Sequence, residues 1–125
     1  MTRRSNLQPV VPVLKDFDCV VHDPIDQWRP DSDEVWYWLT LHIGDPDSDA
    51  ADLYYVAVFT PPGLTAAKQA GQSIGPPPPI VLPKYSWQAV LNVVNARLSL
   101  CEGFGWHDVN QKLRLKFAWE YENHN

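Results

Sequence analysis

The chain has 125 residues, 45% of them apolar, which is enough for one domain with a substantial core and too few for two domains of ordinary size. Its formal net charge of -5 argues against a nucleic-acid-binding protein, because such a protein needs a basic surface that neutralises phosphates. No stretch approaches the roughly 20 apolar residues of a membrane span, and the N-terminus lacks the continuous apolar region of a secretory signal. We therefore expect one domain over residues 1–125, with no direct nucleic-acid or membrane partner.

The two cysteines, Cys19 and Cys101, are far apart and show neither a disulfide framework nor the spacing of a zinc site. Both fit the role of small buried hydrophobic residues, so we do not expect a nucleophilic cysteine. This cysteine usage suits a reducing compartment, and we expect the protein to be cytoplasmic.

The first half of the chain predicts three strands. Val10–Val21 is expected to form a strand at the sheet edge or with a bulge, because Pro12 cannot donate a ladder hydrogen bond. Residues 23–34 are an acidic loop. Val35–Ile43 and Leu53–Thr60 are rich in aromatic and β-branched residues, and the "GDPDSDAA" between them has turn chemistry, so these runs predict an antiparallel hairpin.

The segment after the hairpin is rich in proline. "PPGLTAAKQAG" permits at most a short helical turn, and four consecutive prolines follow it. Such a run favours polyproline II, either as a ligand for an aromatic-lined groove or as a stiff connection to a short strand, Ile80–Leu82. We favour the connection, because no flanking recognition motif is present.

The last third of the chain predicts two helices and a strand. Ser86 is a plausible N-cap for an amphipathic helix, in which apolar residues recur at three- and four-residue steps up to Cys101. "WHDVNQKL" starts a second helical segment. From Leu113 the apolar period changes to two and predicts a final strand. This order of elements predicts an α+β fold with a mostly antiparallel sheet of four to five strands and two or three helices packed on it.

The charge is distributed unevenly along the chain. Between Asp16 and Asp52, eleven acidic residues against the single base Arg29 give a local charge of -10, so the remainder must carry +5 for the total of -5. A charged partner is therefore expected to be basic.

The aspartates after the second predicted strand could suggest a calcium loop. Asp45, Asp47 and Asp49 match the first three ligand positions of an EF-hand, but Ala50 stands at position six, Val56 stands at position twelve, and the flanks are strands. We therefore do not expect calcium binding.

No other metal or catalytic motif is apparent. The histidines, among them His42 beside the aspartates and His124 at the end of the chain, form no HxH or HExxH pattern. One enzymatic alternative remains open, a small acidic α+β enzyme or ligand-binding domain that uses the aspartates. It requires a deep pocket that holds at least two of these carboxylates.

Tryptophans offer a protein-binding interpretation instead. Trp36 and Trp38 share one face of their strand, opposite a uniformly apolar face, so either helices or a partner must cover them. Trp28 lies among the carboxylates of the acidic loop, which is the composition of an anchor with a charged rim.

Five segments follow one another in a distinctive order: "WLTLHIG", "ADLYYVAVFTPPGL", "YSWQAVLNVV", "CEGFGWHDVNQKL" and "WEYE". The most specific features are the Thr60–Pro61 step after a strand, the Cys101–Gly103 triplet before a tryptophan, and the terminal Trp119–Glu122. In this order and spacing the chain resembles the immunity protein 8 family of bacterial polymorphic toxin systems over about residues 35–122.

The resemblance implies an immunity protein that binds and neutralises a cognate toxin made by the same cell or delivered by its kin, as in contact-dependent growth inhibition. It implies no enzymatic activity, no cofactor and no catalytic residue, since the recurrent family residues would maintain the fold. Three features depart from the family pattern: the four-proline insert is long, Gly63 stands where a bulky residue is usual, and the final "NHN" lacks the usual acidic residues.

Toxin recognition would then use the variable, charged segments, and the toxin would be basic, for example a nuclease with a basic substrate groove. The predicted toxin-binding residues are Asp26, Trp28, Asp31, Asp33, Glu34, Asp45, Asp47, Asp49 and Asp52. Nine strand residues separate the two loops by about 30 Å. Both loops can meet one partner only if the interface runs along the sheet, with Trp36 or Trp38 at its centre. The basic C-terminal half around Lys112, Arg114 and Lys116 is the next candidate.

Overall fold

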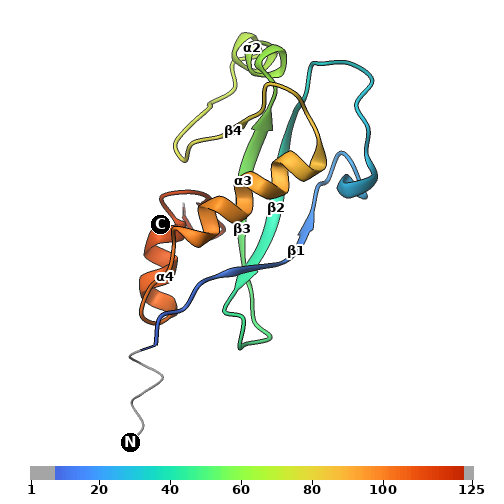
Figure 1. The fold of residues 1–125 in the computed structure, drawn as a ribbon. Helices are drawn as coiled ribbons and strands as arrows, with labels where there is room; N and C mark the ends of the chain where they lie inside the picture. The colour runs from blue at the N-terminus through green and yellow to red at the C-terminus, as the bar shows by residue number, and fades with distance from the viewer. Residues whose placement is uncertain (1–7, 123–125) are drawn as a thin grey trace, which may run out of the picture.

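The computed structural model describes residues 8–122, so His124 lies outside the described part (Figure 1). The described strands form one sheet in the order β1-β2-β3-β4, and β5 also pairs with β3. All pairings except the parallel β3–β4 pair are antiparallel, which confirms the predicted α+β class. The strands are β1 (Val13–Asp18), β2 (Trp36–Gly44), β3 (Asp52–Phe59), β4 (Ile80–Val81) and β5 (Ala118–Trp119), and the helices are η1 (Ile25–Gln27), α2 (Pro61–Gln69), α3 (Trp87–Ser99) and α4 (Trp106–Leu113).

The predicted hairpin is confirmed as β2 and β3. Their register runs from the Trp36–Phe59 pair to the Ile43–Asp52 pair without interruption. β1 is an edge strand with a register shift between Leu14 and Asp16, so the expected edge position and bulge are both present. It is shorter than predicted, because it begins only after Pro12, which has no N–H to donate.

Helices α3 and α4 cover one face of the hairpin (Figure 1). The Ser86 hydroxyl accepts a hydrogen bond from the Ala89 N–H at 3.0 Å, which confirms the expected N-cap of α3. The core between these helices and the sheet is mostly apolar, as expected for alternating strand residues that meet an amphipathic helix face, and the buried Tyr54 hydroxyl donates a hydrogen bond to Asn110 of α4 within it. Its members include Leu39, Leu41, Val56, Val90, Val94, Leu98, Val109 and Leu113.

The prediction of at most a short helical turn after the hairpin was wrong, because α2 is a helix of nine residues. Its sequence contains two prolines, but both stand in the first turn, where the missing N–H groups have no helical partner. The Thr60 side chain caps this turn by accepting the Gly63 N–H. Ala67 and Leu64 then pack on Ala57 and Phe59 of β3, which gives the helix a tertiary partner.

The close contact between α2 and the start of β2 explains why glycine stands at position 63, where the family usually has a bulky residue. A Cβ atom at this position would lie 1.7 Å from the Val35 carbonyl oxygen, so a side chain cannot be accommodated between α2 and the start of β2. The absence of a side chain at Gly63 therefore permits this close packing.

The proline run serves as a connection to β4, as we favoured. The Arg97 guanidinium on α3 donates to the carbonyl oxygens of Pro78 and Pro79 at 2.9 Å each. It also donates to the Lys116 carbonyl at 2.9 Å, so one side chain joins the proline segment to the C-terminal region.

The final strand was predicted to begin at Leu113, and this boundary was wrong. α4 continues through Leu113, and the N–H groups of Lys116 and Phe117 still bond to the Leu113 carbonyl. Only Ala118 and Trp119 pair with β3. Leu115 is 72% exposed, so the alternating apolar pattern does not describe one sheet face here.

Candidate protein-binding surface

The second face of the sheet is only partly covered. Trp36, Trp38, Thr40 and His42 alternate with the buried residues of β2 and so lie on this face. α2 packs at one end, where Trp36 contacts the small cluster around Phe59. On the part of this face beyond α2, Trp38 is exposed and Thr40, His42 and Tyr55 are half-buried. We call this part the open face; it consists of Val20, Val21, Trp38, Thr40, His42 and Tyr55, with Asp16 and Asp18 along its β1 side.

The open face is apolar at its centre. Trp38 is 46% exposed, and the adjacent Val20 and Val21 are 92% and 67% exposed. Together with Trp36, Tyr55 and Gln72, which follows α2, they line a groove of about 480 Å³. Large exposed apolar side chains that share one groove are typical of a protein-binding surface.

Two carboxylates border the open face on the β1 side. Asp16 pairs with His42 and Asp18 pairs with Thr40 across the β1–β2 ladder, so their side chains share the face with Trp38. The Asp18 carboxylate also contacts the His42 ring at 3.0 Å. Asp16 and Asp18 count among the acidic residues of the sequence but were not predicted as part of the site. Their alternation with Phe17 in a predicted strand indicates that both carboxylates lie on the same face.

The predicted residues of the first acidic loop line two neighbouring grooves. Asp26 and Trp28 border a groove of about 440 Å³ beside the start of α3. Asp31 and Asp33 border another of about 610 Å³ beside the start of α2. Glu34 is exposed next to them, and its N–H bonds to the Ser32 hydroxyl.

Trp28 is built into the fold more than its acidic neighbours suggest. Its ring stacks on His22 with centroids 3.7 Å apart and meets Tyr37 and Tyr85 edge to face. The hydroxyls of these tyrosines lie 2.8 Å apart, and burial raises the pKa of Tyr37. Burial also lowers the pKa of His22. Only part of the Trp28 surface is therefore available to a partner.

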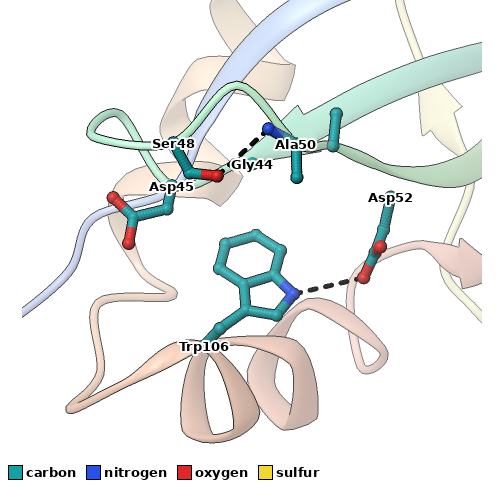
Figure 2. Close-up of a pocket in the computed structure, with 7 residues that line it drawn as sticks. Gly44, Asp45, Ser48, Ala50, Asp52 and Trp106 are labelled. Atoms are coloured by element: carbon teal, nitrogen blue, oxygen red, sulfur yellow. Dashed lines mark hydrogen bonds between the residues drawn. The ribbon is translucent and has the colours of Figure 1, made fainter.

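The predicted aspartates of the second loop have several roles within the hairpin turn (Figure 2). The Asp45 carboxylate accepts the Asp47 N–H at 2.8 Å, which closes a local turn. The Asp52 carboxylate accepts the Trp106 indole N–H at 3.1 Å and so ties β3 to α4. Asp47 and Asp49 are exposed. Sequence reasoning did not assign this bond to Trp106, although this tryptophan belongs to the quoted "CEGFGW" pattern.

The two acidic loops lie at opposite ends of β2 (Figure 1). The structure therefore brings Asp26 together with Trp28, Asp31 with Asp33, and Asp45 with Asp52, but it does not bring the first loop to the second. The open face occupies the space between them along the strand.

The C-terminal "WEYE" segment has a structural role. The Glu120 carboxylate accepts the Leu53 N–H at 2.9 Å, and Glu122 forms two hydrogen bonds with Arg114 at 3.0 and 2.8 Å. The Arg114 hydrogen bond lowers the pKa of Glu122. Because Arg114 also lies 4.9 Å from the centre of the Trp119 ring, this basic residue is occupied by contacts within the chain.

The arrangement of acidic residues offers little support for catalysis. Asp45 and Asp52 line one cavity of about 260 Å³, but Figure 2 shows the Asp45 carboxylate turned away from the Trp106 indole to which Asp52 is bonded. Within residues 8–122 there is no group of three or more His, Cys, Asp or Glu residues that could hold a metal ion. Both cysteines are free and buried, and burial raises the pKa of the Cys101 thiol, which disfavours the nucleophilic thiolate.

A comparison with protein families gives one match, to the model of Immunity protein 8, over residues 13–124. The chain belongs to this family. No curated protein and no solved structure matches the chain significantly. Membership in the Immunity protein 8 family implies that the protein neutralises a toxin, and immunity proteins act as inhibitors and not as enzymes. None of the helices in residues 8–122 is long and apolar enough to cross a membrane.

Proposed function

We propose that this Immunity protein 8 member neutralises its cognate toxin by forming a stoichiometric complex with it. The observation that carries the proposal is the family match over residues 13–124. The partner is a toxin domain with a basic surface, since residues 16–52 carry a local charge of -10. The free, buried cysteines fit a complex that forms in the reducing environment of the cytoplasm.

The acidic loops supply the attraction for this partner. The carboxylates at Asp31, Asp33, Glu34, Asp47 and Asp49 are exposed at both ends of β2, where they act on an approaching protein before contact. Complementary charges of this kind increase the association rate and orient the partner. A nuclease toxin fits this description, because its substrate groove must be basic to bind phosphates.

Co-expression with the toxin encoded beside this gene tests the function. The protein should restore growth of cells that produce the active toxin. A catalytically inactive toxin variant, mixed with the purified protein, should elute from gel filtration as a complex with a fixed ratio of the two chains. An unrelated toxin provides the control and should be neither neutralised nor bound. Continued toxicity together with two separate elution peaks would refute the proposal.

A further inference from the structure

We propose that the toxin docks on the open face of the sheet, with the Trp38 indole as the central anchor of the interface. This inference rests on the proposed function and deepens it, because it names the surface and the chemistry of the partner. The partner surface that fits is an apolar protrusion surrounded by lysine and arginine side chains.

The first argument is the exposure of apolar side chains on a face that could have been covered. α2 shields part of Trp36 at one end of the second sheet face, but Trp38 two residues later is 46% exposed. Val20 and Val21 are exposed beside the same groove of about 480 Å³. A tryptophan beside an apolar groove is the arrangement found at the energetic centre of protein interfaces.

The second argument is the charge around this groove. Asp16 and Asp18 border it on β1, and the acidic loop continues the chain directly after Val21 and His22. Residues 16–34 contain seven acidic residues and one base, Arg29. An acidic rim around an apolar centre selects a partner whose own rim is basic, while the apolar contact supplies most of the affinity.

Two other binding modes fit less well: a symmetric dimer through the open face, and addition of a partner strand to the edge of β1. In a symmetric dimer of this chain the same patch would meet itself, so the acidic side chains of one copy would approach those of the other. Addition of a partner strand to β1 is disfavoured by the bulge between Leu14 and Asp16, which interrupts the free hydrogen-bonding edge. The charge and the backbone thus both favour a basic partner on the face of the sheet.

Binding of the full chain to the catalytically inactive toxin tests this surface. Trp38→Ala should raise the Kd at least about 30-fold, mainly through faster dissociation, as expected for a central aromatic anchor. The double variant V20S/V21S lies outside the strands and should also weaken binding, by about 10-fold or more. Phe104→Ala is the matched control, because Phe104 is 63% exposed in the segment between α3 and α4, and it should bind as the wild type does.

The outcomes separate the surface from the function. Circular dichroism and Tm establish that each variant is folded, and if Trp38→Ala does not fold, V20S/V21S decides. One outcome is that the folded open-face variants bind with the same Kd as a wild-type chain that binds and protects. This result would overturn the docking surface and leave the function intact. A wild-type chain that neither binds nor protects would remove both. A wild-type dimer that Trp38→Ala converts to a monomer, with unchanged toxin affinity, would assign the face to a second copy and overturn the proposal.

Discussion

Individual residues of the acidic loop serve the fold as well as the surface. Trp28 belongs to an aromatic group with His22, Tyr37 and Tyr85 that links the loop to the core. His22 is the member that titrates near neutral pH, and its pKa is lowered because burial disfavours the charged imidazolium. The stability of this loop should therefore depend on pH.

Well above pH 6.5, His22 is neutral in both the folded and the unfolded chain and adds no pH dependence. As the pH falls below this value, the unfolded chain binds the proton first, so the free energy of unfolding decreases until the pH passes the lowered folded pKa. His22→Phe keeps a ring to stack on Trp28 but cannot be protonated. We expect the variant to lose less stability than the wild type between pH 7.5 and 5.5, as measured by urea unfolding at each pH. Equal losses in the two proteins would contradict this role of His22.

At the scale of elements, Thr60 connects the end of β3, the start of β2 and the start of α2. Its hydroxyl accepts the N–H groups of Val35 at 2.9 Å and Gly63 at 3.3 Å, and it donates to the Asp33 carbonyl. The side chain is buried. The Thr60 hydroxyl thus accepts both the Val35 N–H, just before β2, and the Gly63 N–H in the first turn of α2, where water has little access. This explains why the Thr60–Pro61 step is among the most specific features of the resemblance.

Thr60→Ala removes these bonds and leaves the buried Val35 N–H without a partner. We expect the free energy of unfolding to fall by about 2–3 kcal/mol, from the lost cap and the unsatisfied N–H. Thermal or urea unfolding measures this loss. Thr65→Ala is the matched control, because Thr65 is exposed on the same helix and its hydroxyl bonds only to the Pro61 carbonyl. It should change stability by less than about 0.5 kcal/mol, and a similar effect of both variants would contradict the special role of Thr60.

For the whole molecule, the decisive feature is the separation of charge. The segment from 16 to 52 is strongly acidic, while the remainder is net positive. Within the basic half, Lys112 donates to the Glu102 carbonyl at 2.6 Å and Arg114 pairs with Glu122, so these bases also stabilise the fold. The acidic loops place their carboxylates at both ends of the open face, so a toxin docked as proposed would meet negative charge from two directions.

Charge reversal of each loop tests this long-range attraction. D31K/D33K/E34K and D45K/D47K/D49K should each slow association with a basic toxin by about 10-fold or more at low ionic strength. They should also weaken the dependence of the association rate on salt, because fewer attractive charges are left to be screened. Stopped-flow or surface-binding kinetics at several salt concentrations measure both effects.

The matched controls replace the same residues with Asn or Gln, which removes the charge and keeps the size. These neutral variants should slow association less than the reversed ones, and unchanged Tm values would show that the fold is intact. Association of both reversed triple variants at the parental rate would show that the acidic loops do not steer the toxin. The surface around Lys112, Arg114 and Lys116 would then be the next place to examine.

Local patterns were sufficient to predict much of the fold. The hairpin, the edge position of β1, the Ser86 cap and the two C-terminal helices follow from period, turn residues and capping residues, all of which act within a few positions along the chain. The acidic half and the shared face of Trp36 and Trp38 could likewise be predicted, because charge and strand alternation are properties of the sequence itself.

Tertiary contacts decided the rest. α2 forms although its sequence is rich in proline, because Thr60 caps it and the sheet provides an apolar surface for it. The alternation after Leu113 does not become a long strand, because α4 uses that residue as its last buried position. The open face is likewise a result of packing: the length and position of α2 cover part of Trp36 and leave Trp38 exposed, although both side chains point to the same side. Local sequence determines which face a side chain occupies, but whether that face is covered depends on residues far away in the chain.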